Sequence, residues 1–584
     1  MPTIAKWQKF PCVARTFSIE HVFDTTLIQK GRQMSTDTTL VHLFNDRVAS
    51  SSDITAIWIM KDGEFQPHTW NELASDVFRV ATSLAEFVEP GERVVQLSEN
   101  RYEWIVCDLA IQLARAIHVP IHAPLASAQV VAQIRDCDAR VALASTAEQV
   151  EKILVSADEL PPELRLFCFD YSADMEGVEP FTRLLDEQQG STDAVVRAAR
   201  EHVTPESIAT LLYTSGTTGE PKGVILTQSN LTSNALATLD AIEQTTDDLR
   251  VNFLPLSHVF ARTCDLYTWI ALGSQLALAQ SRESVIADCQ ALHPTTLNGV
   301  PYFFDKVRRV LIEMGRADEP DALRNLFGGK IRFFCSGGAA LPDHVFDFYQ
   351  TRGVPILQGY GLTETSPVIS VSSLTHLRRG ASGKVIQDVE ARIADDDEIL
   401  TRGPHLMSGY YHRPEATSEV IQDGWFHTGD YGDVDEDGFL FIRGRKKEII
   451  VTSGGKNVSP VQLESLLTED PLILQAVVIG DDRNYLTALI VPDPDQLRDV
   501  IVQQKWQIVS PAQAVAHPQV IELFGQRIQT QLATVSRYEQ VRTFTLLDRC
   551  FTIESGEMTP KLSLRRDIIA TNYAAQIEAM YRKS

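Results

Sequence analysis

The sequence lacks the features that define several other classes of protein. None of its eight cysteines stands in a CxxC or Cys/His pattern, so neither a zinc site nor a disulfide framework is indicated. No run approaches the roughly 18 apolar residues of a membrane span, and the N-terminus has no apolar core of a secretory signal. We therefore expect a soluble, cytoplasmic protein in a reducing compartment; peripheral contact with a membrane stays open.

Positive charge is also scarce. The 584 residues include 53 Lys and Arg against 77 Asp and Glu, a formal net charge of −24. Such a chain repels phosphate backbones at long range, so nucleic-acid binding is not expected. Residues 445–584 hold 16 basic and 16 acidic side chains, which places the whole acidic excess in residues 1–444. This asymmetry is a weak sign of a domain boundary.

The length requires at least two hydrophobic cores, and the pattern of apolar residues predicts the fold class. Short β-branched runs alternate with helix-periodic stretches, which is typical of α/β layers with largely parallel sheets. The expected strands are 93–97, 119–121, 141–144 and 166–169, and the expected helices are 104–116 and 129–136. Near the end, Ser459, Pro460 and Gln462 predict a helix start. The fold class is therefore α/β, with a large body of layered subdomains (1–444) and a small C-terminal α+β lid (445–584).

Three buried apolar runs are each followed by a segment rich in Gly, Ser and Thr. They are 208–213 before TSGTTGEPKG, 331–335 before SGGAAL, and 354–358 before GYGLTET. In open α/β sheets, ligands bind where loops leave the carboxyl ends of strands, so all three segments are expected to meet at one ligand.

The first of these segments has the composition of a polyphosphate site. Glycines let backbone N–H groups approach oxygen atoms, hydroxyls donate further hydrogen bonds, and Lys222 adds a mobile charge. It is not a Walker A loop, because Gly-x-x-x-x-Gly-Lys-Ser/Thr does not occur in it. Composition alone leaves a flexible surface loop as the alternative.

Four motifs in order resemble the adenylate-forming superfamily of acyl-CoA synthetases. They are YTSGTTGEPKG (213–223), GYGLTETSPV (359–368), WFHTGD (425–430) and GRKKEIIVTSGGKNVSP (444–460). Within the superfamily, PLSHVFAR (255–262), NGVPYFFDKV (298–307) and SGGKNVSP most resemble long-chain fatty acyl-CoA ligases. The resemblance implies that a carboxylate attacks the α-phosphorus of ATP to give acyl-AMP and pyrophosphate, and that the thiol of CoA then displaces AMP.

The resemblance also implies roles for individual residues. ATP and AMP would be bound by Thr214, Ser215, Gly216, Thr217, Thr218, Gly219, Lys222, Gly337, Gly338, Ala339, Gln358, Gly359, Tyr360, Gly361, Leu362, Thr363, Asp430, Ile442 and Arg445. Among these, Asp430 would accept from the ribose hydroxyls, although a turn residue is the alternative. Mg²⁺ would be held by Glu364 with Thr214.

Further residues would serve the acyl group and CoA. His258 would lie beside the acyl carboxylate, with a histidine buried in a core as the alternative. Lys447 would be the hinge of the lid. CoA would contact Gly454, Gly455 and Lys456. The catalytic residues would thus be Thr214, His258, Glu364 and Lys561.

Lys561 carries a departure from the pattern. Long-chain ligases often end in Thr-Pro-x-x-Lys, whereas Ser563 stands at that lysine's place here and Lys561 comes two residues earlier. Residues two apart in an extended segment point the same way, so we favour Lys561 for the role over a solvated surface lysine.

The preferred interpretation is a long-chain fatty acid:CoA ligase that uses ATP, Mg²⁺ and CoA. Two alternatives stay open: a fatty acyl-AMP ligase that loads a carrier protein, and a non-catalytic nucleotide or acyl-AMP sensor, which the displaced lysine suggests. The acyl pocket is expected from segments 254–262 and 298–305. Acyl length and oligomeric state are not legible in the sequence.

Overall fold

The computed structural model describes residues 38–186, 192–215, 221–552, 555–558 and 564–582. Gly216, Thr217, Thr218, Gly219 and Lys561 therefore lie outside the described residues, and of Ser215 only the backbone is described.

An eight-stranded sheet forms one layer of the body. Its strands follow the spatial order β19 (Gly409–Tyr410), β9 (Pro221–Thr227), β8 (Ile208–Ser215), β4 (Ile117–Ile121), β3 (Arg93–Leu97), β5 (Val141–Ala144), β6 (Arg165–Cys168) and β7 (Glu179–Pro180). The strands from β8 to β7 pair in parallel. Helices α2 (Trp70–Leu84) and α3 (Tyr102–Leu113) share a core with one face, and α4 (Ser127–Asp136) and α5 (Ala147–Leu154) with the other. The expected alternation of strands and helices is confirmed.

A nine-stranded sheet forms a second layer. Its order is β16 (Lys384–Val385), β15 (Val368–Val371), β14 (Ile356–Gly361), β13 (Phe333–Ser336), β12 (Thr296–Gly299), β10 (Leu249–Asn252), β11 (Gln275–Leu278), β1 (Thr55–Lys61) and β2 (Glu64–Thr69). The strands from β14 to β1 pair in parallel. Its main core includes residues of α10 (Val285–Leu292), α11 (Pro301–Glu313), α12 (Ala322–Leu326) and α13 (Asp343–Thr351).

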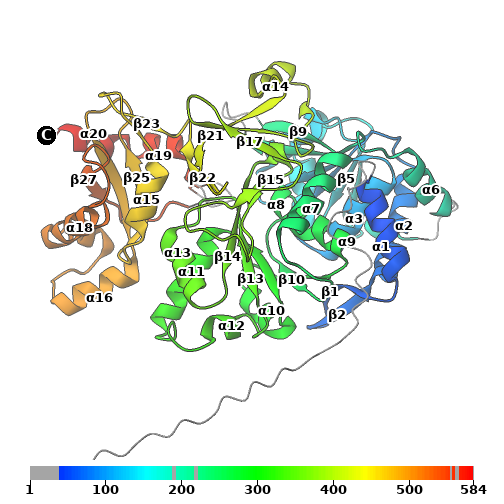
Figure 1. The fold of residues 1–584 in the computed structure, drawn as a ribbon. Coiled ribbons are helices and arrows are strands. Elements are labelled where there is room, and N and C mark those ends of the chain that lie inside the picture. The colour runs from blue at the N-terminus through cyan, green and yellow to red at the C-terminus, as the bar shows by residue number, and fades with distance from the viewer. Residues whose placement is uncertain (1–37, 187–191, 216–220, 553–554, 559–563, 583–584) are drawn as a thin grey trace, which may run out of the picture. The chain divides into compact units, whose positions relative to one another are not determined.

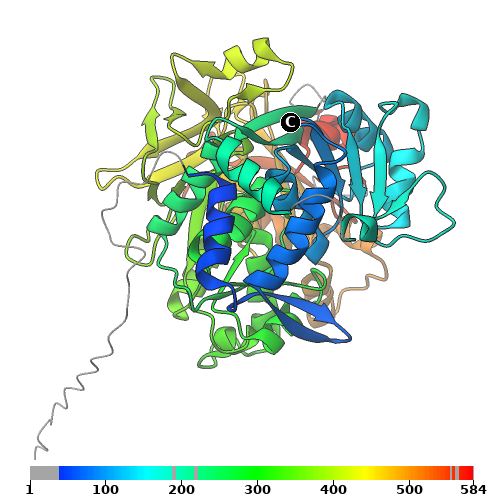
Figure 2. The ribbon, with the colours of Figure 1, turned by 90° about the vertical axis from the view of Figure 1, so that its right-hand side faces the viewer.

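Helical segments connect the two sheets through one large core cluster. It contains residues of both sheets and of α1 (Leu40–Ser51), α6 (Thr192–His202), α7 (Gln228–Ala241), α8 (Val259–Ala261), the π-helix η3 (Arg262–Tyr267) and α9 (Thr268–Leu272). Figure 2 shows the dark-blue helix α1 beside the lighter blue helices that follow it in sequence, with which it is in contact. Because the cavity described below draws on strand ends of both sheets, this shared core helps to fix its walls.

A smaller antiparallel sheet follows in sequence. It contains β17 (Glu390–Ile393), β18 (Glu398–Arg402), β20 (Ile421–Gln422), β21 (Trp425–Val434) and β22 (Leu440–Arg445), with α14 (Pro414–Val420) inserted before β20. The structure overturns one expectation, for β14, and removes one alternative, for β21. GYG is not a loop, because β14 continues through Gly361 against β15. Asp430 is not a turn residue, because it lies within β21 and pairs with Arg445 of β22.

The C-terminal part has cores of its own, which lie wholly beyond residue 449. Its strands are β23 (Ile450–Val451), β24 (Asn457–Val458), β25 (Ile473–Ile479), β26 (Leu486–Pro492) and β27 (Val541–Leu546); its helices are α15 (Pro460–Thr468), α16 (Pro494–Gln504), α17 (Pro511–Val515), α18 (Pro518–Gln531), α19 (Arg566–Asn572) and α20 (Ala574–Arg582). Helix α15 packs on β25 and α18 on β27 (Figure 1). Ser459 caps α15 as predicted, since its hydroxyl accepts from Gln462 N. The α/β class with a small C-terminal α+β domain is thus confirmed. Within the described ranges, no helix is both long and apolar enough to cross a membrane.

Candidate functional site

A cavity of about 1010 Å³ gathers residues from all four sequence motifs. Many predicted site residues line it, namely Thr214, Lys222, His258, Gly337, Gly338, Gly359, Tyr360, Gly361, Leu362, Thr363, Glu364, Arg445 and Lys447. The three segments expected to meet at one ligand therefore do line a common space, although they leave strands of two different sheets.

The cavity needs small residues at two points where backbone and side chains come close. A Cβ on Gly361 would lie 1.6 Å from the carbonyl oxygen of Pro367, and one on Gly337 would lie 3.1 Å from the Phe260 ring. The first contact excludes any side chain at position 361 unless the backbone shifts. The second allows a side chain at position 337 only if the Phe260 ring moves. Close contacts in the cavity wall thus explain why glycine stands at both positions.

Asp430 is held by two residues that line the cavity. The side chain is 4% exposed. Tyr360 Oη donates to Oδ2 at 2.7 Å, and Arg445 Nε lies 3.1 Å from Oδ1. Burial raises the pKa of Asp430, while Arg445 and Tyr360 oppose that rise. The result is a carboxylate fixed in orientation, as an acceptor for a pair of sugar hydroxyls would have to be.

Glu364 belongs to a second cluster in the cavity. It lies in the short 3₁₀-helix η4 (Thr363–Thr365), and Tyr410 Oη donates to its Oε1 at 2.8 Å. Lys222 Nζ stands 5.0 Å from the centre of the same tyrosine ring, so the ammonium and the carboxylate share one neighbour. In the described part of the chain no three His, Cys, Asp or Glu side chains group to hold a metal. A single carboxylate does fit Mg²⁺ that is bound chiefly through substrate phosphates.

His258 begins the short helix α8. Its Nδ1 accepts from the backbone N–H of Phe260 at 3.1 Å, so the neutral ring carries its proton on Nε2. This N-cap geometry explains why a histidine fits at this position. It also leaves the ring able to donate from Nε2, which an acyl carboxylate could accept.

Sequence reasoning missed a charged network on the cavity wall. The 5% exposed Glu398 accepts from Gly429 N at 2.9 Å and contacts His427 Nδ1 at 3.1 Å and Lys446 Nζ at 3.3 Å. Lys446 also pairs with Asp396 at 2.6 Å. Burial alone would raise the pKa of Glu398, but these hydrogen bonds hold it below its usual value. Glu398 thus ties Gly429, the β21 residue before Asp430, to Lys446, the residue that follows Arg445.

Other predicted residues lie apart from the lining. Ala339 follows the glycine pair after β13, Gln358 lies within β14, and Ile442 within β22. The predicted CoA residues Gly454, Gly455 and Lys456 form the turn between β23 and β24, where Lys456 Nζ stands 5.7 Å from the centre of the Tyr538 ring.

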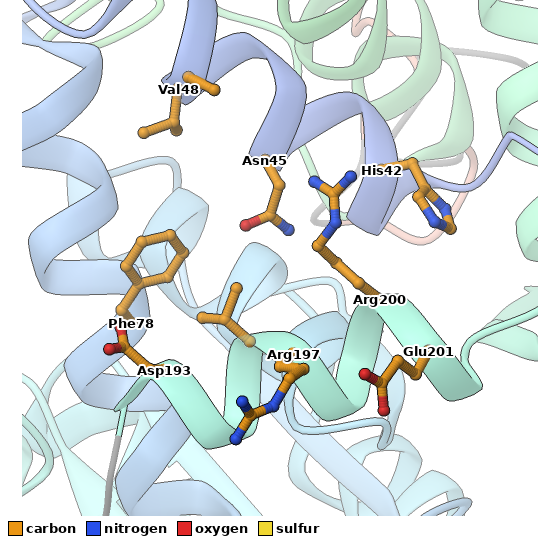
Figure 3. Close-up of a pocket in the computed structure, with 10 residues that line it drawn as sticks. His42, Asn45, Val48, Phe78, Asp193, Arg197, Arg200 and Glu201 are labelled. Carbon is orange, nitrogen blue, oxygen red and sulfur yellow. The ribbon is translucent and has the colours of Figure 1, made fainter.

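A separate hollow of about 660 Å³ lies among α1, α2 and α6 (Figure 3). Its polar residues include Arg197, Arg200 and Glu201 of α6, and Arg200 pairs with Asp46 of α1 at 2.9 Å. None of the predicted site residues lines it. The chemistry suggested by the motifs therefore belongs to the larger cavity.

Comparisons with known proteins agree with the motifs. Residues 44–411 match the family described as AMP-binding enzyme, and residues 447–584 match the AMP-binding enzyme C-terminal domain. The long-chain-fatty-acid–CoA ligase FadD15 of Mycobacterium tuberculosis is 34% identical over 568 residues, covering 89% of this chain and 93% of that protein. The human long-chain-fatty-acid–CoA ligase ACSBG1 is 26% identical over 622 residues, with 93% and 85% covered.

Solved structures show the same fold at low identity. The anthranilate CoA ligase AuaEII in complex with anthranoyl-AMP superposes with a TM-score of 0.75 at 20% identity, over 92% of this chain and 98% of that one. ATP-bound MatB from Rhodopseudomonas palustris gives a TM-score of 0.71 at 23% identity, over 92% and 99%. With both of its parts matched in order and a relative at 34% identity, the chain belongs to the family of AMP-binding enzymes, the adenylate-forming family that its motifs resemble.

Proposed function

We propose that the chain is an acid–thiol ligase that activates a long-chain fatty acid with ATP and transfers the acyl group to CoA. The observation that carries this proposal is the cavity lined by residues of all four motifs, including those predicted to bind phosphate, to hold Mg²⁺ and to act as the hinge. The curated relatives named long-chain-fatty-acid–CoA ligases support the choice of acid and of thiol.

The reaction proceeds in two balanced displacements. A fatty acid carboxylate oxygen attacks the α-phosphorus of ATP, and pyrophosphate leaves with the electron pair of the broken P–O bond. The thiol of CoA then gives its proton to solvent, and its sulfur attacks the acyl carbon; the C–O bond to AMP breaks, and AMP leaves with that electron pair. The first step develops charge on phosphate oxygens, so catalysis rests mainly on positioning and electrostatic stabilisation.

Each group of cavity residues has a part in this scheme. Lys222 stabilises the phosphate charge, and the His258 Nε2–H orients the fatty acid carboxylate. Tyr360 and Arg445 hold Asp430, whose two oxygens accept from the ribose. Mg²⁺, when bound, would neutralise phosphate charge, and Glu364 with Thr214 would hold it.

The proposal includes a cytoplasmic location. The seven described cysteines are all free thiols, as a reducing compartment would leave them. Cell fractionation tests this part, and recovery of the protein in an oxidising compartment would contradict it. Membrane-surface contact and oligomeric state stand outside the proposal.

A single assay tests the function. The purified protein receives ATP, Mg²⁺ and fatty acids of graded length, and pyrophosphate release is followed with CoA, with a phosphopantetheine-bearing carrier protein, and with neither. Turnover that requires CoA and is greatest with long chains is expected. Turnover only with the carrier protein would show that the carrier, and not CoA, is the acyl acceptor. Binding of ATP without any turnover would indicate a sensor.

A further inference from the structure

A buried aspartate joins the two segments from which the acyl pocket was predicted. Asp265 lies in the π-helix η3, which continues α8 and is buried at every residue. Its fully buried carboxylate accepts from Asn252 Nδ2 at Oδ2 and from Asn298 Nδ2 at Oδ1, both at 2.7 Å. Arg250 is the nearby cation, with NH1 3.4 Å from Oδ1.

The two asparagines stand where the two segments begin. Asn252 is the last residue of β10 and leads directly into segment 254–262. Asn298 lies in β12 and is the first residue of segment 298–305. Phe253, which precedes segment 254–262, packs against Phe303 of segment 298–305, with ring centres 4.7 Å apart. A single carboxylate therefore links the starts of both segments.

The hydrogen bonds continue from Asp265 toward His258. Asn252 Oδ1 accepts from Asn100 Nδ2 at 2.7 Å, and Asn100 Nδ2 also donates to Leu254 O at 2.6 Å. Asn100 Oδ1 in turn accepts from Leu256 N at 2.9 Å. The network thus reaches the backbone two residues before His258, which lines the cavity.

A buried carboxylate of this kind contributes little to the stability of the fold. Burial raises the pKa of Asp265 to about 6, against the lowering effect of Arg250 and the two asparagines. Replacing buried ionic groups by well-packed apolar residues is often neutral or stabilising, so a role in specifying geometry explains the carboxylate better than a role in stability.

We propose that Asp265 is a positioning residue for the fatty acid, which sets the spacing of segments 254–262 and 298–305 by holding Asn252 and Asn298. Through that spacing it determines the width of the acyl pocket and the place of His258. The inference rests on the proposed function, because it assumes that a fatty acid binds between these segments.

The test is steady-state kinetics of the full-length Asp265→Asn variant. An amide has one acceptor oxygen instead of two, so one of the two asparagines loses its partner. We expect KM for the fatty acid to rise roughly tenfold, the order of one lost hydrogen bond to a charged group. The KM values for ATP and CoA should stay within about twofold, since no described hydrogen bond joins Asp265 to a residue predicted to bind either one.

A second exchange and a matched control separate positioning from folding. The double variant Asp265→Asn, Asn298→Asp restores an amide–carboxylate pair with its direction reversed and should recover part of the lost affinity. Asp288→Asn is the control: Asp288 is 2% exposed and accepts from Gln280 and Ser284 within α10 and the segment before it, away from both acyl segments. It should leave KM for the fatty acid unchanged.

The outcomes distinguish this inference from the function beneath it. If the wild type turns over fatty acids but Asp265→Asn leaves their KM unchanged, or raises all three KM values alike, the positioning role is wrong. Should Asp265→Asn not fold, Asn298→Ser carries the same expectation with a smaller rise in KM, and an unchanged KM there overturns the role. A wild type without fatty-acid-dependent turnover would overturn both the function and the inference.

Discussion

The carboxylate of Asp430 offers the most direct test of the nucleotide site. Asp430→Asn keeps the size of the side chain and replaces one of its two acceptor oxygens by an NH₂ group. In the structure both oxygens are engaged, one by Tyr360 Oη at 2.7 Å and the other by Arg445 Nε at 3.1 Å. The amide NH₂ must therefore face one of these donors, and the ribose loses an acceptor.

The magnitude follows from the charge on the acceptor. A hydrogen bond to a charged group contributes about 1.5–3 kcal/mol, and its loss leaves a buried donor without a partner. Since each 1.36 kcal/mol is a factor of ten in rate, kcat/KM for ATP should fall roughly ten- to hundredfold. The ribose is bound before and during the reaction, so most of the loss should appear as a higher KM for ATP.

Pyrophosphate release at varied ATP concentration measures this effect. Asp433→Asn is the matched control, because Asp433 lies on the same strand, is half exposed and pairs with Arg443 outside the cavity. A KM for ATP that changes less than twofold in Asp430→Asn, or an equal rise in KM for the fatty acid, would refute the ribose-binding role.

Three further variants probe other parts of the chain. Lys447→Pro should spare acyl-AMP formation but slow thioester formation. A hinge is needed only when the C-terminal domain rotates to replace the residues that serve the first half-reaction by those that serve the second. Single-turnover assays of each half-reaction measure this. Lys561→Ala should cripple acyl-AMP formation in the pyrophosphate-exchange assay, since it removes the cation that we expect beside the reacting phosphate. Glu464→Gln should lower the free energy of unfolding by roughly 3 kcal/mol in urea, because Glu464 is buried and accepts from both terminal nitrogens of Arg566. The substitution would leave the Arg566 charge with only the more distant carboxylate of Glu448, 3.7 Å away.

Each of these expectations has a contrary outcome. Equal loss in both half-reactions would contradict a hinge at Lys447, and a near-normal exchange rate in Lys561→Ala would mean that another residue carries the role. For Glu464, the exposed pair of Glu390 with Arg402 provides the control. Glu390→Gln should change the free energy of unfolding little. An equal effect of the two substitutions would show that the burial of Glu464 does not increase the stabilising effect of its ion pair.

Strands with local signals were predictable, and those set by distant partners were not. Val141–Ala144 has the predicted bounds, because an uninterrupted buried apolar run bounded by polar residues is readable from the sequence itself. Gly359 and Tyr360 read as a loop, but β14 continues through them because Val371 and Ser370 of β15 supply ladder partners. Such a partner cannot be recognised from a glycine-rich segment alone.

The same distinction holds for the site. Lys222, Glu364 and Arg445 stand in contiguous motifs, and all three line the cavity. Glu398 stands in no motif, and its partners His427 and Lys446 are 29 and 48 residues away in sequence. Asp265 is similar, because Asn252 and Asn298 reach it from two strands whose adjacency only the folded sheet provides. Residues that position others thus escape sequence reasoning more readily than residues that touch a ligand.

The charge of the cavity gives the acidic composition a further meaning. Among its described lining residues the cations are Lys222, Arg445, Lys446 and Lys447, and the acids are Glu364, Asp396, Glu398, Glu419 and Glu448. Four cations against five acids produce no positive field that could draw in ATP, and the net charge of −24 opposes it at long range. If the proposed function is correct, capture of ATP would therefore rest on short-range groups such as backbone N–H donors and individual cations of the lining, rather than on long-range attraction.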